Sequence, residues 1–310
     1  MNPTRSQGRA VPTTIRFTPV TNGIDFLRSV VGHLGKGANE LRHEDLKYGV
    51  LHLHAATEVL LKARLTHEHW SQVLEDPSTA QLAKFRSGDF KSCSMEDALG
   101  RLDRVAGIQI DAGSRSAIKS LTKTRNALQH YGLEHPAEAV EANAGNVLNF
   151  LINFLDEHLL PHLPEDQRWD AEESMESVRY GLAAIQAFVK KRRKEIRDEV
   201  ERHPDVTVQC HICRDPALVV GSPQARCRFC TTTMPGEAAA IYYVTDILKR
   251  PYRSVPEPPD AIFSQPAQPP VDKCPHCAHV ALVTGTLTNA KPEGIDLCFH
   301  CAQANPPLSA

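Results

Sequence analysis

Several features that would directly assign a compartment or a chemistry are missing from this sequence of 310 residues. No stretch approaches 18 apolar residues, and the N-terminal segment has no apolar core of signal-peptide type, so neither membrane insertion nor secretion is expected. The formal net charge of -2 excludes a protein that coats nucleic acid through a general cationic excess. A phosphate-binding glycine loop and a G-x-S-x-G nucleophile elbow are also missing. We therefore expect a cytoplasmic protein with no membrane partner, whose contacts with nucleic acid would depend on local clusters of Lys and Arg.

Helical periodicity dominates the first two thirds of the chain, over residues 21–203. Apolar residues recur there at steps of three and four, the pattern of amphipathic helices with one buried face. The predicted helices cover residues 39–70, 95–105, 113–131, 137–160 and 169–202. Long amphipathic helices joined by short loops favour an antiparallel bundle, so the predicted fold class is mainly α.

Local signals support some of these helix ends. Ser94 followed by Asp97 resembles a capping box at the start of a helix. Gly132 can supply the left-handed residue that ends the helix 113–131. Residues 1–20 mix Pro, Thr and Arg without periodicity, and we expect them to form a flexible arm.

The predicted helix 169–202 starts with acidic residues and ends in the basic run KKRRKEIR. This charge order complements the helix macrodipole, which is the simpler interpretation. The alternative is a phosphate-binding patch, because six cations within eight residues are enough to bind several phosphates. The candidate RNA-binding residues in this run are Lys190, Lys191, Arg192, Arg193, Lys194 and Arg197.

Eight of the nine cysteines form four C-x-x-C pairs after residue 209. A repeat with a period of 64 residues begins at the first and third pairs, as CHICRDPALVVG at 210–221 and CPHCAHVALVTG at 274–285. Each copy predicts a knuckle, a short β-strand and a glycine turn. Cys93 stands alone and is expected to be a small buried residue. The candidate metal ligands are Cys210, Cys213, Cys227 and Cys230 in one set, and Cys274, Cys277, Cys298 and Cys301 in the other.

Four thiolates from two C-x-x-C turns satisfy tetrahedral zinc and leave no position for a substrate. We therefore expect two structural zinc ions per chain, and the two complete quartets argue against a redox role for any single pair. Both segments, 204–235 and 271–310, resemble zinc ribbons. Residues 236–270 between them are expected to form a short helix and a proline-rich linker. The ribbons are candidate sites for RNA or for a protein partner.

The stretch TRNALQHYG places Arg125 and His130 near the end of the predicted helix 113–131. The same spacing of Arg and His occurs twice earlier, at Arg28 to His33 and at Arg64 to His69, so spacing alone carries no information. The position of Arg125 and His130 on the helix is more informative than their spacing. Four side chains that project within about 40° of one another form a basic stripe, those of Lys119, Lys123, Asn126 and His130. Lys119 and Lys123 therefore join the candidate RNA-binding residues.

Arg125 projects elsewhere, toward the apolar stripe of the same helix. A guanidinium is not buried there without a partner, so Arg125 is expected to face a polar cleft or another chain. Glu58 is interpreted as the partner of Lys62 four residues on, although it could also orient Arg125. The simpler alternative is that Arg125 extends past its neighbours into solvent and that charged His130 stabilises the helix C-terminus. The histidines of residues 52–69 lack an H-E-x-x-H pattern and are interpreted as surface or hydrogen-bonded core residues.

An all-helical domain with Arg-Asn-x-x-x-His near the end of a helix resembles the HEPN superfamily. The resemblance covers residues 22–160 in helix order, and at single positions it rests on Arg125, Asn126 and His130. It implies a helical bundle, a metal-independent endoribonuclease activity with these three residues catalytic, and no cofactor for the reaction. It also implies a homodimer, because such enzymes commonly build the active groove at a two-fold interface.

This chemistry suits the three residues. The 2′-hydroxyl of RNA is the nucleophile, so the protein supplies a base, for which His130 is suited, and a cation for the phosphate, for which Arg125 is suited. Asn126 can orient either of them. Arg125 and His130 lie about 140° apart on an ideal helix, so either the helix unwinds before Gly132 or the two side chains meet in a groove.

The leading prediction is a HEPN-type endoribonuclease whose zinc ribbons select or position the RNA target. The resemblance suggests that such an enzyme acts as a toxin or in defence against phage. The alternative is a non-catalytic dimeric adaptor that binds RNA or protein through the helical domain and the ribbons. A third possibility is a DNA-binding regulator that uses the basic helix and the ribbons.

Overall fold

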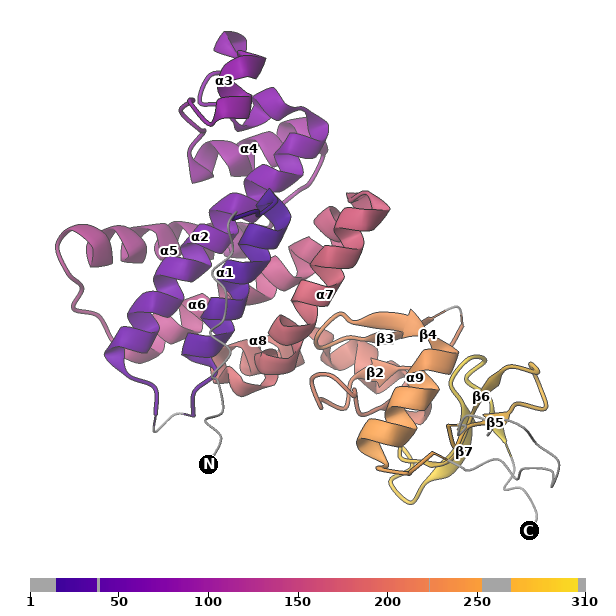
Figure 1. The fold of residues 1–310 in the computed structure, drawn as a ribbon. Helices are drawn as coiled ribbons and strands as arrows, with labels where there is room; N and C mark the ends of the chain where they lie inside the picture. Colours follow the sequence, from indigo (N-terminus) through magenta and orange to yellow (C-terminus); the bar gives the residue numbers. More distant parts are fainter. Residues whose placement is uncertain (1–14, 38–39, 223, 253–268, 306–310) are drawn as a thin grey trace, which may run out of the picture.

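The structure is a computed structural model that describes residues 15–37, 40–222, 224–252 and 269–305. Figure 1 shows two parts, a helical part coloured indigo to rose and a smaller part with short strands coloured orange and yellow. Most of the predicted N-terminal arm and most of the proline-rich linker lie outside the described residues.

The helical part confirms the mainly α class. Its helices are α1 (Pro19–Leu34), α2 (His43–Glu68), α3 (Leu82–Ser87), α4 (Met95–Ala106), α5 (Ala112–His130), α6 (Ala137–Phe154), α7 (Glu165–Gly181) and α8 (Gln186–Arg202). The predicted capping box is confirmed, since Ser94 and Asp97 exchange side-chain and main-chain hydrogen bonds at the start of α4. Gly132 has the predicted positive φ, 91°, just after α5. Among the described helices, none is both long and apolar enough to cross a lipid bilayer.

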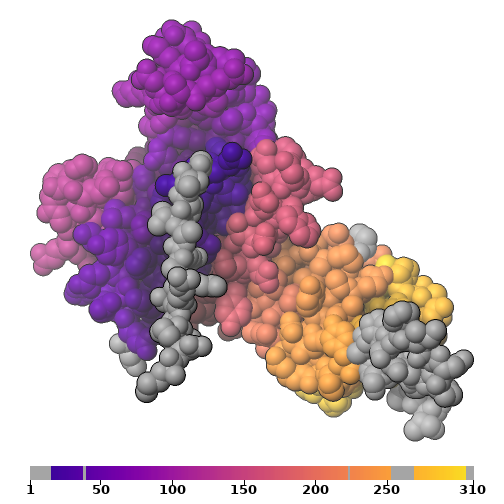
Figure 2. Space-filling view, in the orientation of Figure 1, coloured from indigo at the N-terminus to yellow at the C-terminus, as the bar shows by residue number. Residues whose placement is uncertain are grey.

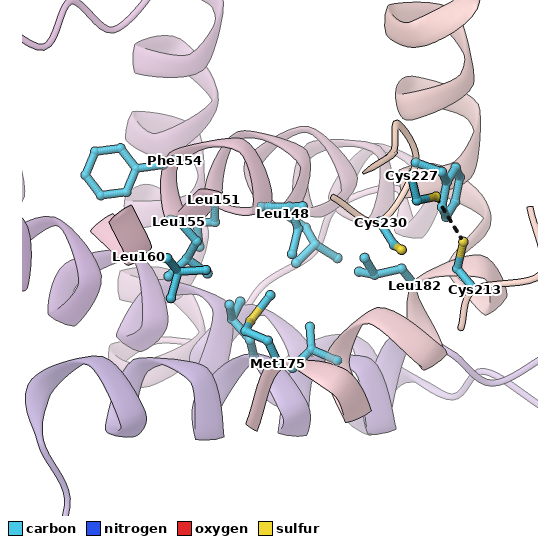
Figure 3. Close-up of a cluster of buried hydrophobic side chains, with 14 of the residues drawn as sticks. Leu148, Leu151, Phe154, Leu155, Leu160, Met175, Leu182, Cys213, Cys227 and Cys230 are labelled. Carbon is cyan, nitrogen blue, oxygen red and sulfur yellow. Dashed lines mark hydrogen bonds between the residues drawn. The ribbon is translucent and has the colours of Figure 1, made fainter. Parts of the chain in front are cut away.

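The core of this part lies where α1, α2, α6 and α7 meet. α1 packs against α2 and α7, whereas α6 packs against α2, α5 and α8. Figure 3 shows Leu148 and Leu151 of α6 facing Met175 of α7, and all three side chains are buried. The antiparallel arrangement of the bundle stays a prediction.

The predicted single helix over 169–202 is wrong. α7 ends at Gly181, a 3-10 turn covers Leu182–Ala184, and α8 starts at Gln186. A Cβ atom on Gly181 would lie 2.0 Å from Cγ1 of Val31 in α1, so the chain passes too close to α1 for a side chain here. The acidic residues therefore lie on α7 and the basic run on α8, and the macrodipole interpretation of their order does not hold.

The described strands form two small antiparallel sheets of four strands each. The first contains β1 (Thr207–Val208), β2 (Leu218–Val219), β3 (Gln224–Cys227) and β4 (Thr233–Pro235), and the second contains β5 (Asp272–Lys273), β6 (Val280–Thr286), β7 (Ile295–Cys298) and β8 (Ala304–Asn305). β2 and β6 are the strands predicted after the two first knuckles. Between the sheets, α9 (Gly236–Tyr242) continues as a π-helical turn over Tyr243–Ile247.

The two sheets contact each other directly through their backbones. Val208 and Thr288 form an isolated bridge between them, and the amide of Asn289 donates to the carbonyl oxygen of Thr207 at 2.9 Å. α9 contacts β3 and β4 of the first sheet and β6 of the second. We call the described part of residues 204–305 the ribbon unit; Figure 2 shows it against the α7–α8 region of the helical part.

Candidate functional site

Each cysteine quartet has the geometry of a four-coordinate metal site. In the first, the Sγ–Sγ distances are 3.9 Å for Cys210–Cys230 and 3.7 Å for Cys213–Cys227. In the second, the corresponding pairs are separated by 3.8 and 3.7 Å. Four sulfurs at about 2.3 Å from a central ion lie about 3.8 Å apart, the edge of that tetrahedron. All eight cysteines are free of disulfides, so each quartet could hold one metal ion.

The four knuckles share an unusual backbone conformation. The residue directly after each C-x-x-C pair has a positive φ of 59–65°, although none of the four is glycine: Arg214, Thr231, Ala278 and Ala302. In each case its amide donates to the carbonyl oxygen of the first cysteine of the pair, at 2.9–3.0 Å. A left-handed non-glycine residue is costly and persists where surrounding structure fixes it. The fourfold recurrence indicates that sulfur placement determines this conformation.

The thiols of the first quartet affect one another's ionisation. Hydrogen bonds from neighbouring thiols, that of Cys213 first, hold the pKa of Cys210 far below its usual range. Burial raises the pKa of Cys227, and the adjacent Cys210 raises it further. The opposite directions show that ionisation of one thiol disfavours ionisation of its neighbours, because negative sulfurs this close repel one another. A divalent ion would remove that repulsion and allow further thiols to ionise.

The structure places Arg192 inside the protein, so this residue is not part of an exposed phosphate patch. The residue is 4% exposed. Its Nε donates to the carbonyl oxygen of Phe229 at 2.9 Å, and Nη1 donates to Asn153 of α6. Burial lowers its pKa from the usual value, and Glu195 counteracts that effect. Arg192 therefore joins α6, α8 and the second knuckle.

The arginines of the first ribbon also act internally. Arg226 pairs with Asp156, and Arg228 pairs with Glu199 of α8 at 3.1 Å. In the reverse direction, Arg193 of α8 donates twice to Asp215 of the ribbon, at 3.0 and 2.8 Å. These ion pairs cross the boundary between the helical part and the ribbon unit. Arg226 and Arg228 thus help to hold the first ribbon against the helices.

Four of the six cations in the basic run remain available at the surface of α8. They are Lys190, Lys191, Lys194 and Arg197, all exposed. The three lysines line a groove of about 420 Å³ whose other wall includes Glu138 and Glu141 of α6. On α5, Lys119 and Lys123 are exposed as the predicted stripe requires.

The Arg-Asn-His motif lies on a free end of α5. The buried side chains of this helix are Ala117, Ile118 and Leu121, all in its first half. Every side chain from Thr122 to His130 is half-buried or exposed. Figure 1 shows this end pointing away from the rest of the helical part.

Within the motif, Arg125 is half-buried and donates from Nη1 to Oδ1 of Asn126 at 2.9 Å. His130 is exposed. The helix does not unwind before Gly132, because α5 continues through His130 and the amide of Tyr131 still donates to the carbonyl oxygen of Ala127. Arg125 and His130 therefore stay on different faces of one helix. Unwinding of the helix before Gly132 is therefore ruled out as a way to bring Arg125 and His130 together, and the second predicted possibility, a groove in which the two side chains meet, is left.

A residue that the sequence did not single out is affected electrostatically by Arg125. His54 of α2 is 6% exposed, and its Nε2 has no hydrogen-bond partner among the described residues. Burial lowers the pKa of His54, and the charge of Arg125 lowers it further. The histidines of this segment are interpreted from the sequence as surface or hydrogen-bonded core residues. This interpretation is wrong for His54, because its Nε2 is buried without a hydrogen-bond partner among the described residues. Glu58 pairs with Lys62 at 2.5 Å, as the simpler interpretation held.

Comparison of the chain with protein-family models, with curated proteins and with solved structures finds no match.

Proposed function

We propose that this protein is a metal-independent endoribonuclease of HEPN type, and that its two cysteine quartets hold structural zinc. The quartets support zinc because four thiolates in a closed tetrahedron match the ligand set of structural zinc sites. Thiolate metal sites are typical of reducing compartments, which supports a cytoplasmic location. A role as a toxin or in phage defence is part of the proposal and rests on the family resemblance alone.

The observation that carries the nuclease proposal is the missing counter-ion of Arg125. Several buried or half-buried arginines pair with carboxylates, as Arg64 does with Glu68 and Arg179 with Glu172, and others, such as Arg101, donate to main-chain carbonyl oxygens. Arg125 has neither a carboxylate nor a main-chain acceptor among the described residues; its one hydrogen bond there goes to the neutral side-chain amide of Asn126. A half-desolvated guanidinium without an anion is suited to accept one, and its planar fork matches a phosphate.

Each motif residue then has a distinct task. Arg125 binds the scissile phosphate and stabilises the charge that develops on it. Asn126 holds the guanidinium in place through its side-chain oxygen. His130 removes the proton of the 2′-hydroxyl and a proton is returned to the leaving 5′-oxygen, so the products are a 2′,3′-cyclic phosphate and a free 5′-hydroxyl.

A single chain does not bring His130 and Arg125 to one phosphate, since they stay on different faces of α5. We propose that a second copy supplies the missing side of the groove, through the free half of α5. Tyr131 is 84% exposed at that end, and its ring lies 5.9 Å from that of His130. An exposed aromatic side chain beside the motif suits a contact between two copies.

The test uses full-length protein and a structured RNA without added divalent metal. The wild type should cleave it to a 2′,3′-cyclic phosphate, and His130→Ala should lower the rate by about 10² to 10⁴-fold. His135→Ala, which changes an exposed histidine five positions along the chain, serves as the matched control and should cleave normally. Failure of the wild type to cleave, or equal cleavage by His130→Ala, would refute the nuclease.

A mixing experiment tests the shared groove. Arg125→Ala and His130→Ala are each expected to be inactive alone, whereas a mixture that exchanges chains should regain activity if one groove uses Arg125 of one copy and His130 of the other. A mixture that stays inactive although mixed dimers form would show that both residues must come from one chain.

The alternative proposal is a non-catalytic adaptor, and the ion pairs between α8 and the ribbon unit favour it as the second candidate. They fix the ribbon unit on α8 as a rigid surface, which suits docking of a partner. RNA that is bound but not cleaved would support this alternative. Charge reversal of Lys190 and Lys194 should then weaken RNA binding and reduce its salt dependence, and reversal of exposed Lys84 and Arg86 on α3 is the control.

A further inference from the structure

A third group of metal-ligand side chains lies in the ribbon unit, outside both cysteine quartets. Glu237 is in the first turn of α9, His279 follows the first knuckle of the second ribbon, and His300 lies within its second knuckle. One ligand atom from each of them lies within 4.8 Å of the other two. Oε1 of Glu237 is 3.3 Å from Nδ1 of His300 and 3.8 Å from Nε2 of His279.

Close backbone packing places Glu237 at this position. A Cβ atom on Gly236 would lie 2.6 Å from the carbonyl oxygen of Phe299 and 2.7 Å from Cα of His300. The first turn of α9 therefore touches the backbone of the second knuckle, which a residue other than glycine would prevent. The carboxylate of the next residue, Glu237, is thereby brought to the imidazole of His300.

Hydrogen bonding directs the lone pair of His279 toward Glu237, and Nδ1 of His300 has no hydrogen bond that would occupy it among the described residues. Nδ1 of His279 lies 3.0 Å from the carbonyl oxygen of Cys277, so a proton on Nδ1 is donated there and the lone pair is on Nε2, the atom near Glu237. Histidine ligands of metals commonly hold their second nitrogen in this way. Nδ1 of His300 is buried and has no hydrogen-bond partner among the described residues.

We propose that Glu237, His279 and His300 bind a third metal ion, a divalent transition-metal ion such as zinc or cobalt. Two imidazoles and one carboxylate are typical ligands of such ions. Ligand atoms at about 2.1 Å from a tetrahedral ion lie about 3.4 Å apart, near the two observed distances. The rings of His279 and His300 are stacked, with centroids 3.5 Å apart, so metal binding requires the ring of His279 to tilt out of this stack. Its side chain is 45% exposed and has room to do so.

Unlike the cysteine quartets, this site leaves one coordination position of the metal ion without a protein ligand. Three ligands do not complete a tetrahedron, and the side chains of Glu237, His279 and His300 are 37%, 45% and 23% exposed. The fourth position is thus accessible to water or to an anionic group of a bound molecule. The ion also joins α9 to both knuckles of the second ribbon.

The test supplies full-length protein with one zinc ion for each cysteine quartet, which fills the closed thiolate sites and leaves the three-ligand site without zinc. The protein is then dialysed against Co²⁺, which binds more weakly than zinc and does not displace it from the thiolates. The wild type should bind one Co²⁺ per chain without the sulfur-to-cobalt charge-transfer band of a thiolate site. Glu237→Gln and His279→Ala should each weaken this binding about tenfold or more. His276→Ala is the matched control, because His276 is an exposed histidine of the same ribbon outside the group.

Zinc content and circular dichroism of each variant show whether the quartets and the fold are intact. With two zinc ions retained, loss of Co²⁺ in Glu237→Gln and His279→Ala but not in His276→Ala supports the third site. Absence of Co²⁺ binding by the wild type, or equal binding by wild type and His279→Ala, overturns it.

Discussion

The Nε of Arg192 donates to the main-chain oxygen of Phe229 at 2.9 Å, and this bond ties α8 to the second knuckle of the ribbon unit. The side chains of Phe188 and Phe229 meet edge to face beside it, with ring centroids 5.4 Å apart. A charged group and an aromatic pair thus occupy the same junction. The buried side chains of the ribbon unit and of the helices form one continuous core.

Replacement of Arg192 by Met should destabilise the protein by about 2–4 kcal/mol, because the carbonyl oxygen of Phe229 would be buried without a donor. Urea unfolding followed by circular dichroism measures the change. Lys191→Met, on the exposed neighbour, should alter stability by less than about 0.5 kcal/mol. Equal midpoints for the two variants would contradict the role of Arg192.

Gly236→Ala should loosen α9 from the second ribbon. The added methyl group would lie 2.6–2.8 Å from backbone atoms of Phe299 and His300, which have no flexible end to move. We expect a loss of about 1–3 kcal/mol, measured as a lower thermal midpoint. Gly32→Ala in α1 is the matched control; no heavy atom would lie within 4 Å of the new Cβ, and the change should stabilise the helix by about 0.5–1 kcal/mol.

His54 should make the helical part less stable in acid. Its pKa in the folded protein is lowered by burial and by Arg125 from the ordinary value of 6.5. Below pH 6.5 the unfolded chain binds a proton there that the folded chain binds less readily, so stability falls as the pH falls, by about 1.4 kcal/mol per unit of pKa difference.

The free energy of unfolding between about pH 7.5 and pH 5 measures this effect. His54→Leu should flatten the dependence, in part, since burial also lowers the pKa values of His52 and His67. His135→Leu, at an exposed position, should leave the slope as it is. A slope that His54→Leu leaves unchanged would show that His54 is not involved.

Cys227→Ala should remove about one thiolate-bound metal ion per chain, because the remaining three sulfurs no longer close the tetrahedron. Metal analysis after dialysis against metal-free buffer gives the count. Cys93→Ala is the control, since Cys93 is buried in the helical core and belongs to neither quartet. The same metal content in Cys227→Ala and wild type would exclude this quartet as a metal site.

The features that short local patterns encode were predictable from the sequence. Spacing of the cysteines predicted both quartets, because a C-x-x-C turn places two sulfurs together wherever it occurs. The capping box of α4 was predictable for the same reason, since its hydrogen bonds join Ser94 and Asp97, which are three residues apart in the sequence.

Features set by distant contacts were not predictable. The break after Gly181 depends on Val31 in α1, and the burial of Arg192 depends on acceptors in α6 and in the second knuckle. The group of Glu237, His279 and His300 comes from three separate segments, and none of them has a ligand pattern of its own. The partly desolvated position of Arg125 was expected from its place on the apolar face of the helix, but the neighbour His54 was not.

The positions of α5 and the ribbon unit have a further consequence. Figure 1 shows the free end of α5 and the ribbon unit on opposite sides of the helical part. In a dimer paired through α5, the two ribbon units would therefore lie at the outer ends of the assembly. Two separated copies of one binding surface act together through effective concentration, which can raise apparent affinity for a repetitive target by about 10² to 10⁴-fold. Such a molecule would discriminate targets by the spacing of their repeats as well as by their chemistry.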